Sequence, residues 1–321
     1  MRDFALGTGA VVLLGVGAAL WLLRPRAAPI VEYAMPRRAD VPAAITAAPN
    51  GAIWFTIDGS DVLGVLRNGH LEQVSRGSRS IDAIGIAVEP GGAVWYTDEQ
   101  RASITRLAPD GTAAEFPLGS GIARLGRLAA DPDGGVWFAD YTANAITHLR
   151  DGVFTPHVIP TDNAGPFGVG LAAAGDVWFT ESYVSKLGRL GRDGGLAEFE
   201  TPTRNSQPTD LVVDASGAVW FTEVRGNKIG RFADGAFSEY PVPTAQSGLA
   251  GLAVAGDGAV WFAELRGQRL GRLRDSTFTE FGLPSKDARP LGVTTTGDGS
   301  VWYTDLTGRV GRLPPEVARS R

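Results

Sequence analysis

The sequence contains no cysteine, and only three histidines and two methionines among its 321 residues. The absence of cysteine excludes disulfide bonds and thiolate metal sites, and it is compatible with either side of a membrane. Basic side chains are not in excess either, since 30 Lys and Arg stand against 35 Asp and Glu. Binding to nucleic acid requires a basic stripe, so the composition predicts no nucleic-acid partner.

Tryptophan, by contrast, is frequent, and seven of its eight copies recur in one context. Val or Ile precedes each of the seven indoles and Phe or Tyr follows it. These copies, spaced by 41 or 42 residues, are Trp54, Trp95, Trp137, Trp178, Trp220, Trp261 and Trp302. A fixed period near 40 residues with one hydrophobic strand per unit is typical of a β-propeller or a solenoid.

Each repeat contains four short apolar runs separated by turn signals. In the repeat of Trp261 we expect strands at residues 251–254, 259–264, 270–273 and 278–283. Pairs such as Gly256-Asp257 between these runs favour hairpins, because glycine accepts the positive φ that such turns need. Four antiparallel strands in about 41 residues predict one blade of a propeller.

The fourth strand carries the pattern hydrophobic-x-Glu-aromatic, as in residues 237–240 and 278–281. Six copies follow the first Trp, and the last repeat ends near Leu313 without one. The seventh copy lies at the other end of the domain, in residues 30–36. We expect this N-terminal strand to complete the last blade and close the ring, which removes the open sheet edges. The sequence therefore predicts an all-β, seven-bladed β-propeller of residues 30–313 with four-stranded antiparallel blades, followed by a short tail at 314–321.

The first 29 residues are of another kind. Residues 4–23 contain no charge and are long enough to cross a bilayer as a helix, which predicts a transmembrane signal anchor or a signal peptide. No clean small-x-small cleavage site follows this segment, which runs into Arg24-Pro25-Arg26, so we expect an uncleaved anchor that contacts the membrane through residues 4–23. A positive-inside count would leave the propeller in the cytoplasm. Single N-terminal segments commonly export the domain behind them, so we expect a periplasmic or extracellular propeller, with a cytoplasmic one as the alternative.

Three features together resemble the streptogramin B lyase (virginiamycin B lyase) family. They are the Trp-Phe-Thr-Glu unit that leads to residues 227–231, the outer Glu-Tyr strand, and the loop around Arg289-Pro290-Leu291. The resemblance extends over residues 30–313 and implies a seven-bladed propeller. Members of known activity open a cyclic depsipeptide by β-elimination across its ester bond, using a divalent metal that is usually magnesium. Such a reaction needs a base for the α-proton and an electrophile that stabilises the enolate.

The resemblance places a catalytic histidine eleven residues before the Trp of each of the last two repeats, with an acidic metal ligand two residues before the second. This chain has Ala250 and Leu291 at the two histidine positions and Arg289 at the acidic one. We therefore expect no catalysis by the family mechanism and no cofactor. The chain's own histidines lie elsewhere, where we expect surface or packing roles: His70, His148 and His157.

Six of the seven repeats end their second strand with a carboxylate: Asp98, Asp140, Glu181, Glu223, Glu264 and Asp305. One interpretation is a ring of carboxylates around the mouth of the central channel, available to a cation or a polar ligand. The other is that each carboxylate fixes its own blade through backbone amides or a basic neighbour. Repetition in six blades favours the second interpretation, because a site needs one arrangement and a scaffold needs seven.

The loops that enter the first strand of each repeat differ from one another, and variable loops on a rigid frame usually carry binding. From them we predict a ligand site at the channel mouth, formed by Ile84, Arg124, Phe167, Asp210, Arg289 and Leu291. The three apolar members favour an apolar or amphipathic ligand, or a protein partner, over a small ionic substrate. The first hypothesis is therefore a membrane-tethered or exported propeller that binds a ligand or partner.

The alternative is an enzyme. It would be a divergent lyase that opens a cyclic depsipeptide by metal-assisted β-elimination, and so confers antibiotic resistance, or a hydrolase related to lactonase propellers. Such an enzyme would use Mg²⁺, with Asp82, Asp210 or Glu264 as metal ligands or base.

Overall fold

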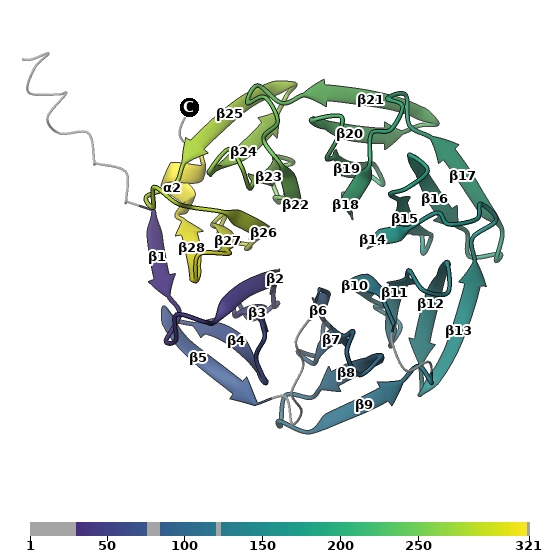
Figure 1. Ribbon diagram of the computed structural model, residues 1–321, viewed down its shortest axis with the longest axis horizontal. Helices are drawn as coiled ribbons and strands as arrows, with labels where there is room; N and C mark the ends of the chain where they lie inside the picture. Colours follow the sequence, from purple (N-terminus) through teal and green to yellow (C-terminus); the bar gives the residue numbers. More distant parts are fainter. Residues whose placement is uncertain (1–29, 76–83, 120–122, 320–321) are drawn as a thin grey trace, which may run out of the picture.

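A computed structural model describes residues 30–75, 84–119 and 123–319. These residues form seven four-stranded antiparallel sheets arranged as blades around one axis (Figure 1). The first strand of each blade lies next to the axis, and the fourth lies at the circumference. The predicted all-β, seven-bladed propeller is confirmed.

The strands follow the repeats in chain order. Blade one contains β2 (Val41–Ala47), β3 (Ile53–Asp58), β4 (Val62–Arg67) and β5 (His70–Ser75), and blade two contains β6 (Ile86–Val88), β7 (Val94–Asp98), β8 (Ser103–Leu107) and β9 (Ala113–Pro117). Blade three contains β10 (Leu125–Ala130), β11 (Val136–Asp140), β12 (Ala145–Arg150) and β13 (Val153–Val158), and blade four contains β14 (Pro166–Leu171), β15 (Val177–Glu181), β16 (Lys186–Leu190) and β17 (Leu196–Glu200). Blade five contains β18 (Pro208–Val213), β19 (Val219–Glu223), β20 (Lys228–Ala233) and β21 (Ala236–Pro241), and blade six contains β22 (Leu249–Val254), β23 (Val260–Glu264), β24 (Arg269–Arg274) and β25 (Thr277–Gly282).

Blade seven joins the two ends of the domain. Its strands are β26 (Pro290–Thr295), β27 (Val301–Asp305), β28 (Arg309–Leu313) and, at the circumference, β1 (Val31–Ala34). Glu32 of β1 accepts hydrogen bonds from the Ser285 hydroxyl at 2.7 Å and from the Tyr303 hydroxyl at 2.9 Å. The N-terminal strand therefore closes the ring as the sequence predicts, and Glu32 fastens it to the strands inside.

The repeated tryptophans pack each blade against the next. Trp54 of blade one lies in a buried cluster with Val94 and Tyr96 of blade two. Trp302 of blade seven lies in the corresponding cluster with Ile53 and Phe55 of blade one. Burying large aromatic side chains at equivalent positions stabilises all the blade interfaces in the same way.

In five of the seven blades, a glycine in the third strand makes room for the aromatic residue that follows the Trp. A Cβ at Gly230 would lie 2.1 Å from Cζ of Phe221, and one at Gly271 would lie 2.1 Å from Cζ of Phe262. In three of these blades the arginine after the glycine lies over the indole: Arg231, Arg272 and Arg312. The guanidinium carbon of Arg231 lies 5.5 Å from the ring centre of Trp220. These cation–π contacts hold the third strand against the second strand of the same blade.

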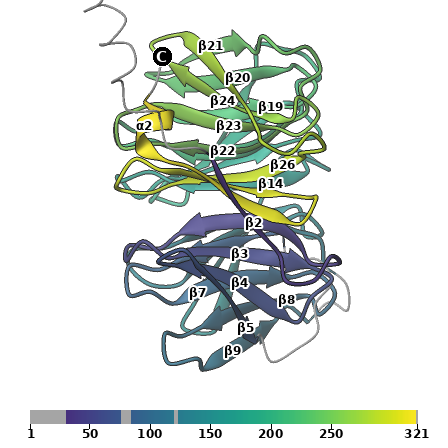
Figure 2. The ribbon, with the colours of Figure 1, turned by 90° about the vertical axis from the view of Figure 1, so that its left-hand side faces the viewer.

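The chain continues after β28 into a short helix, α2 (Pro315–Ala318). Ala318 is buried, and its carbonyl accepts a hydrogen bond of 2.5 Å from Arg272 of blade six. In the side view α2 lies at one face of the disc (Figure 2). Of the helices that the structure describes, none is long and apolar enough to cross a bilayer, and the predicted segment at 4–23 lies outside the described residues.

Candidate functional site

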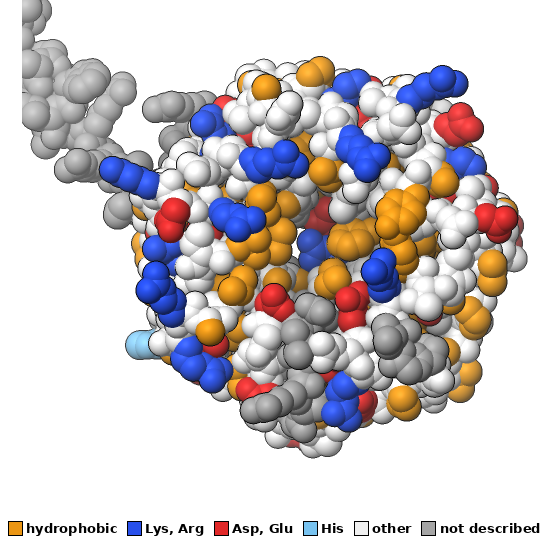
Figure 3. All heavy atoms as spheres, in the orientation of Figure 1, with side chains coloured by type: hydrophobic (Ala, Val, Ile, Leu, Met, Phe, Trp, Pro, Cys, Tyr) orange, Lys and Arg blue, Asp and Glu red, His pale blue; other side chains and the backbone are white. Residues whose placement is uncertain are grey.

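Two kinds of loop share one face of the propeller. Each first strand begins where the second strand of its blade ends, as shown by the pairing of Pro166 in β14 with Glu181 in β15. The loops that enter the blades and the turns after the second strands therefore lie together, on what we call the mouth face. Figure 3 views this face and shows hydrophobic side chains around a central hollow.

The hollow contains a cavity of about 230 Å³, the mouth cavity. Its apolar walls include Ile84, Phe167 and Leu291, which come from the loops or first strands of blades two, four and seven, together with Leu306. The three apolar residues predicted from the sequence thus lie in one cavity. Such walls suit an apolar group.

Arg127 of β10 lines the mouth cavity and also the channel behind it. Its Nη1 donates a hydrogen bond of 3.0 Å to the carbonyl of Ile84, and its guanidinium carbon lies 5.8 Å from the ring centre of Phe167. Its Nε lies 3.4 Å from Oδ1 of Asp210, with which it forms an ion pair. Arg127 therefore holds the base of the mouth cavity in place.

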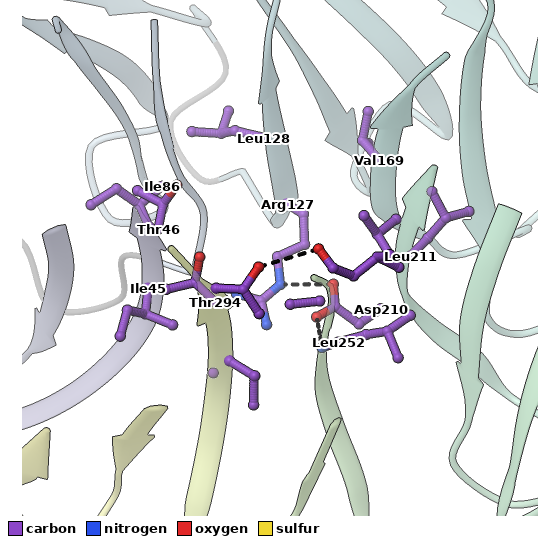
Figure 4. A pocket seen from close by; sticks show the side chains of 16 residues that line it. Ile45, Thr46, Ile86, Arg127, Leu128, Val169, Asp210, Leu211, Leu252 and Thr294 are labelled. Atoms are coloured by element: carbon purple, nitrogen blue, oxygen red, sulfur yellow. Dashed lines mark hydrogen bonds and ion pairs between the residues drawn. The ribbon is translucent and has the colours of Figure 1, made fainter. Parts of the chain in front are cut away.

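Asp210 lies deeper than predicted. It is 8% exposed and lines a second cavity of about 300 Å³ in the channel (Figure 4). Its Oδ2 accepts a hydrogen bond of 3.0 Å from the amide of Leu252 in blade six. Both carboxylate oxygens of Asp210 thus have protein partners, and Asp210 joins blade five to blades three and six.

The other predicted mouth residues lie at the rim or elsewhere. Arg124 and Arg289 are exposed in the loops before β10 and β26, and neither lines a channel cavity. The amide of Arg289 donates to Asp305 at 3.0 Å, which fixes this loop. Ala250 is half-buried and packs against the core of blades six and seven. Asp82 lies outside the described residues.

The carboxylates that end the second strands do not form a ring around the mouth, because they are buried inside the blades and line neither channel cavity. Asp98 accepts the amide of Arg101 at 3.1 Å, and Asp140 accepts the amide of Ala143 at 2.8 Å. Both bonds stay within the turn that follows the strand. This arrangement agrees with the structural interpretation of the repeated acids.

The three glutamates of this series are fully buried: Glu181, Glu223 and Glu264. Burial raises their pKa values to about 8, about 7 and about 8, and a second glutamate near each one adds to the effect. Glu264, proposed above as a ligand of the enzyme alternative, is fully buried and lines neither channel cavity.

The histidines have packing or surface positions. His148 stacks on Trp137 with ring centres 4.3 Å apart, and its Nε2 lies 3.0 Å from Asp131. Burial lowers the pKa of His148, although Asp131 opposes the shift. His157 lies beside the same indole, and His70 is exposed at the start of β5. None of the three lines a channel cavity.

The side chains at the mouth do not fit a magnesium ion, which prefers oxygen ligands in octahedral geometry. Where the resemblance places two histidines and an acid, Ala250, Leu291 and Arg289 offer no oxygen donor. Across residues 30–75, 84–119 and 123–319, no three His, Asp or Glu side chains are grouped so as to hold a metal. No step of a metal-assisted reaction can be assigned to this mouth.

Arg127 was missed from the sequence, although the repeats contain a signal for it. Ten residues before each Trp, five blades have a small residue: Ala44, Gly85, Gly168, Gly251 and Gly292. The other two blades have Arg127 and Asp210, the ion pair of the channel. A Cβ at Gly168 would lie 2.5 Å from the carbonyl oxygen of Thr209, so side chains are generally excluded here. Two opposite charges at a position otherwise reserved for small residues indicate a pair.

Comparison with known proteins agrees with this architecture. The Virginiamycin B lyase family matches residues 25–149 and 70–318. Virginiamycin B lyase of Nocardia farcinica (strain IFM 10152) is 31% identical over 152 residues, which are 47% of this chain and 52% of that protein. The chain thus aligns with about half the length of this curated relative.

Solved structures of lyases superpose closely. A streptogramin B lyase structure has a TM-score of 0.84 at 27% identity, covering 88% of this chain and 96% of the other. A catalytically inactive His-to-Ala variant of virginiamycin B lyase from Staphylococcus aureus, with quinupristin, has a TM-score of 0.84 at 24% identity, covering 88% and 98%. Taken with the seven blades and the N-terminal closing strand, the match of the family model to residues 25–149 and 70–318 establishes that the chain belongs to the virginiamycin B lyase family.

Proposed function

We propose that this propeller is a binding module whose mouth cavity takes the apolar part of an amphipathic ligand or of a protein partner, without β-elimination by the family mechanism. One observation carries the proposal. Leu291, at a position where the resemblance places a catalytic histidine, forms the wall of the cavity together with Phe167 and Ile84. An apolar side chain cannot take the α-proton that the elimination requires.

The relatives supply a precedent for binding without turnover. The Staphylococcus aureus structure pairs an inactive His-to-Ala variant with quinupristin, so in that protein the ligand is present although the enzyme is inactive. The present chain has alanine at one of the two family histidine positions, Ala250. A propeller of this family can therefore serve as a receptor for a ligand that it leaves intact.

A neutral apolar probe tests the binding site. We expect N-phenyl-1-naphthylamine to fluoresce on addition of the full-length protein, and Leu291→Asp to weaken its binding about tenfold, because a carboxylate in an apolar cavity costs free energy. The matched control is Val158→Asp, which changes a 69% exposed residue of β13. Equal probe binding by wild type and Leu291→Asp would show that the mouth cavity is not the site.

Incubation with a cyclic B-type streptogramin, with and without Mg²⁺, tests the absence of catalysis. We expect mass spectrometry to find no linear product from the wild-type protein. Formation of linear product, and its loss in Asp210→Asn, would support the lyase alternative and contradict our proposal. The variant with Ala250→His, Leu291→His and Arg289→Glu restores the residue types that the resemblance places at these positions. We expect this variant to form linear product if the scaffold positions the three side chains correctly.

We also propose that residues 4–23 tether or export the propeller to the periplasmic or extracellular side. The support is the uncharged 20-residue run itself. Fusing alkaline phosphatase behind residue 321 tests the orientation, since that enzyme is active only after export. An inactive fusion that is present at normal level would place the propeller in the cytoplasm.

A further inference from the structure

Six arginines on the mouth face have no acidic partner: Arg38, Arg124, Arg204, Arg225, Arg266 and Arg289. All six are exposed. In the part of the chain that the structure describes, none has a nitrogen within 4.0 Å of an Asp or Glu oxygen. Elsewhere the arginines are often paired, as Arg106 is with Glu89 at 2.7 Å.

The backbone holds these arginines in place. The amide of Arg225 donates to the carbonyl of Ser206 at 3.0 Å, and the amide of Arg266 donates to the carbonyl of Ser247 at 2.9 Å. The amide of Arg289 is fixed by Asp305, as described above. Binding through these residues would therefore cost side-chain entropy but little loop ordering.

An exposed aromatic residue lies among them. Tyr183, 62% exposed, packs edge-on against Tyr141 with ring centres 5.3 Å apart. Tyr183 and Arg225 line the same small depression between blades four and five. Tyrosine and arginine are the residue types that protein interfaces enrich and that carry much of their binding energy.

Acidic side chains also lie on this face. Asp58, which lines the mouth cavity, belongs to blade one, and Glu99, which accepts the amide of Leu125, belongs to blade two. The unpaired arginines lie on the loops and turns of blades one, three, five, six and seven, and the exposed Asp287 lies two residues before Arg289. Figure 3 shows Lys and Arg side chains over much of this face, with acidic side chains at the margin of the hollow and among them. We call the unpaired arginines of this face the basic arc, and they belong to a chain whose net charge is −5.

We propose that the mouth face binds an acidic polypeptide segment with one apolar anchor residue, which enters the mouth cavity while its carboxylates pair with the basic arc. This inference rests on the proposed binding function. The mouth cavity of about 230 Å³ is smaller than the roughly 300–1,000 Å³ of sites for whole small molecules, so it suits a single side chain. Guanidinium groups without intramolecular partners are suited to bidentate pairing with carboxylates. Because the net charge of the chain is acidic, the chain as a whole does not attract anions, and any binding of an acidic segment must come from the basic arc.

Three labelled peptides of twelve residues test the proposal by fluorescence anisotropy with the full-length protein. One contains Asp and Glu around a central Phe, the second has Ser in place of Phe, and the third has Asn and Gln in place of the acids. We expect the first to bind at least about tenfold more tightly than the others, and more weakly as salt is raised. Equal binding of the acidic and the amide peptide would overturn the proposal.

Matched variants localise the effect. We expect the triple variant Arg225→Ala, Arg266→Ala and Arg289→Ala to lose about tenfold in affinity for the acidic Phe peptide. The control removes the same charge from exposed arginines on the opposite face: Arg150→Ala, Arg192→Ala and Arg319→Ala. An equal loss in the control would show unspecific electrostatics and overturn the proposal. If the neutral naphthylamine binds at the mouth but no acidic peptide does, this inference fails and the binding function stands; if neither binds, both fail.

Discussion

The guanidinium of Arg127 in blade three lies 3.4 Å from the carboxylate of Asp210 in blade five, with blade four between them. Arg127 also donates to the carbonyl of Ile84 in blade two, and Asp210 accepts the amide of Leu252 in blade six. Two side chains thus connect blades on opposite sides of the channel. Arg127 lines both the mouth cavity and the channel cavity, and Asp210 lines the channel cavity, so the pair lies where the two cavities meet.

We expect the Arg127–Asp210 pair to contribute to stability as a unit. The variants Asp210→Asn and Arg127→Met should each lower Tm, because each leaves a largely buried partner uncompensated. The double variant should be more stable than the sum of the single effects predicts, with a coupling of about 1–3 kcal/mol. Calorimetry of the four proteins measures this coupling, and strictly additive effects would show that the two groups do not interact.

Glu32 should be important for closing the ring. Glu32→Ala removes the acceptor of the Ser285 and Tyr303 hydroxyls and leaves the fully buried Tyr303 hydroxyl without it. We expect a loss of about 1–3 kcal/mol, seen as a lower midpoint of unfolding in urea. Glu72→Ala, which removes an exposed partner of Arg67, is the control and should change the midpoint little. A similar midpoint for both variants would contradict a special role of Glu32.

The glycines of the third strands should not tolerate a side chain. In Gly271→Ala the added Cβ would lie 2.1 Å from Cζ of Phe262, so the ring must move within a packed core. We expect a loss of about 1–3 kcal/mol from overpacking. Gly282→Ala is the matched control, since no atom lies within 4 Å of its added Cβ and its φ is ordinary. Thermal unfolding of both variants measures this loss. A Tm of Gly271→Ala equal to that of the wild type would show that the core accommodates the methyl group.

The buried glutamates should make stability depend on pH. The pKa values of Glu181 and Glu264, about 8, and of Glu223, about 7, lie above the ordinary 4.5. Between these values the folded chain holds protons that the unfolded chain releases, so stability falls as pH rises from about 4.5 to 8 and then levels off. Replacing all three by Gln should raise Tm at pH 8.5 and leave it nearly unchanged at pH 5.

An exposed glutamate provides the control for this pH dependence. Glu72→Gln should leave the difference in Tm between pH 5 and pH 8.5 as it is in the wild type, because that side chain is exposed. If the triple Gln variant keeps the wild-type pH dependence, the three acids are ionised in the folded protein at neutral pH.

The repeat made the fold predictable from sequence. Seven Trp contexts recur at nearly constant spacing, and each repeat forms one four-stranded blade that packs against its neighbours in the same way. The outer-strand pattern around Glu32 was enough to predict ring closure. The last repeat lacks its fourth strand and the N-terminal end has an extra one, and pairing the two leaves no open sheet edge. Strand limits differ by one or two residues, as for the first strand of blade six, which begins at Leu249.

The site was only partly predictable. Ile84, Phe167 and Leu291 were predicted together since they hold the same position in different repeats, and equivalent positions converge on the axis of a ring. Arg124 and Arg289 were placed at the cavity on the same reasoning, yet both are exposed at the rim. Loop residues one or two positions from the strand can point outward, and the periodicity does not fix their direction.

By itself the sequence determined the number of blades, the order of strands, the closing strand and the apolar character of the mouth, since all of these follow from local patterns that recur. Tertiary structure alone decided that Arg127 and Asp210 meet across the channel and that Glu264 is buried away from it. It also decided which arginines have acidic partners. Pairing between side chains from different blades depends on distances across the ring, and those distances exist only after the blades have packed.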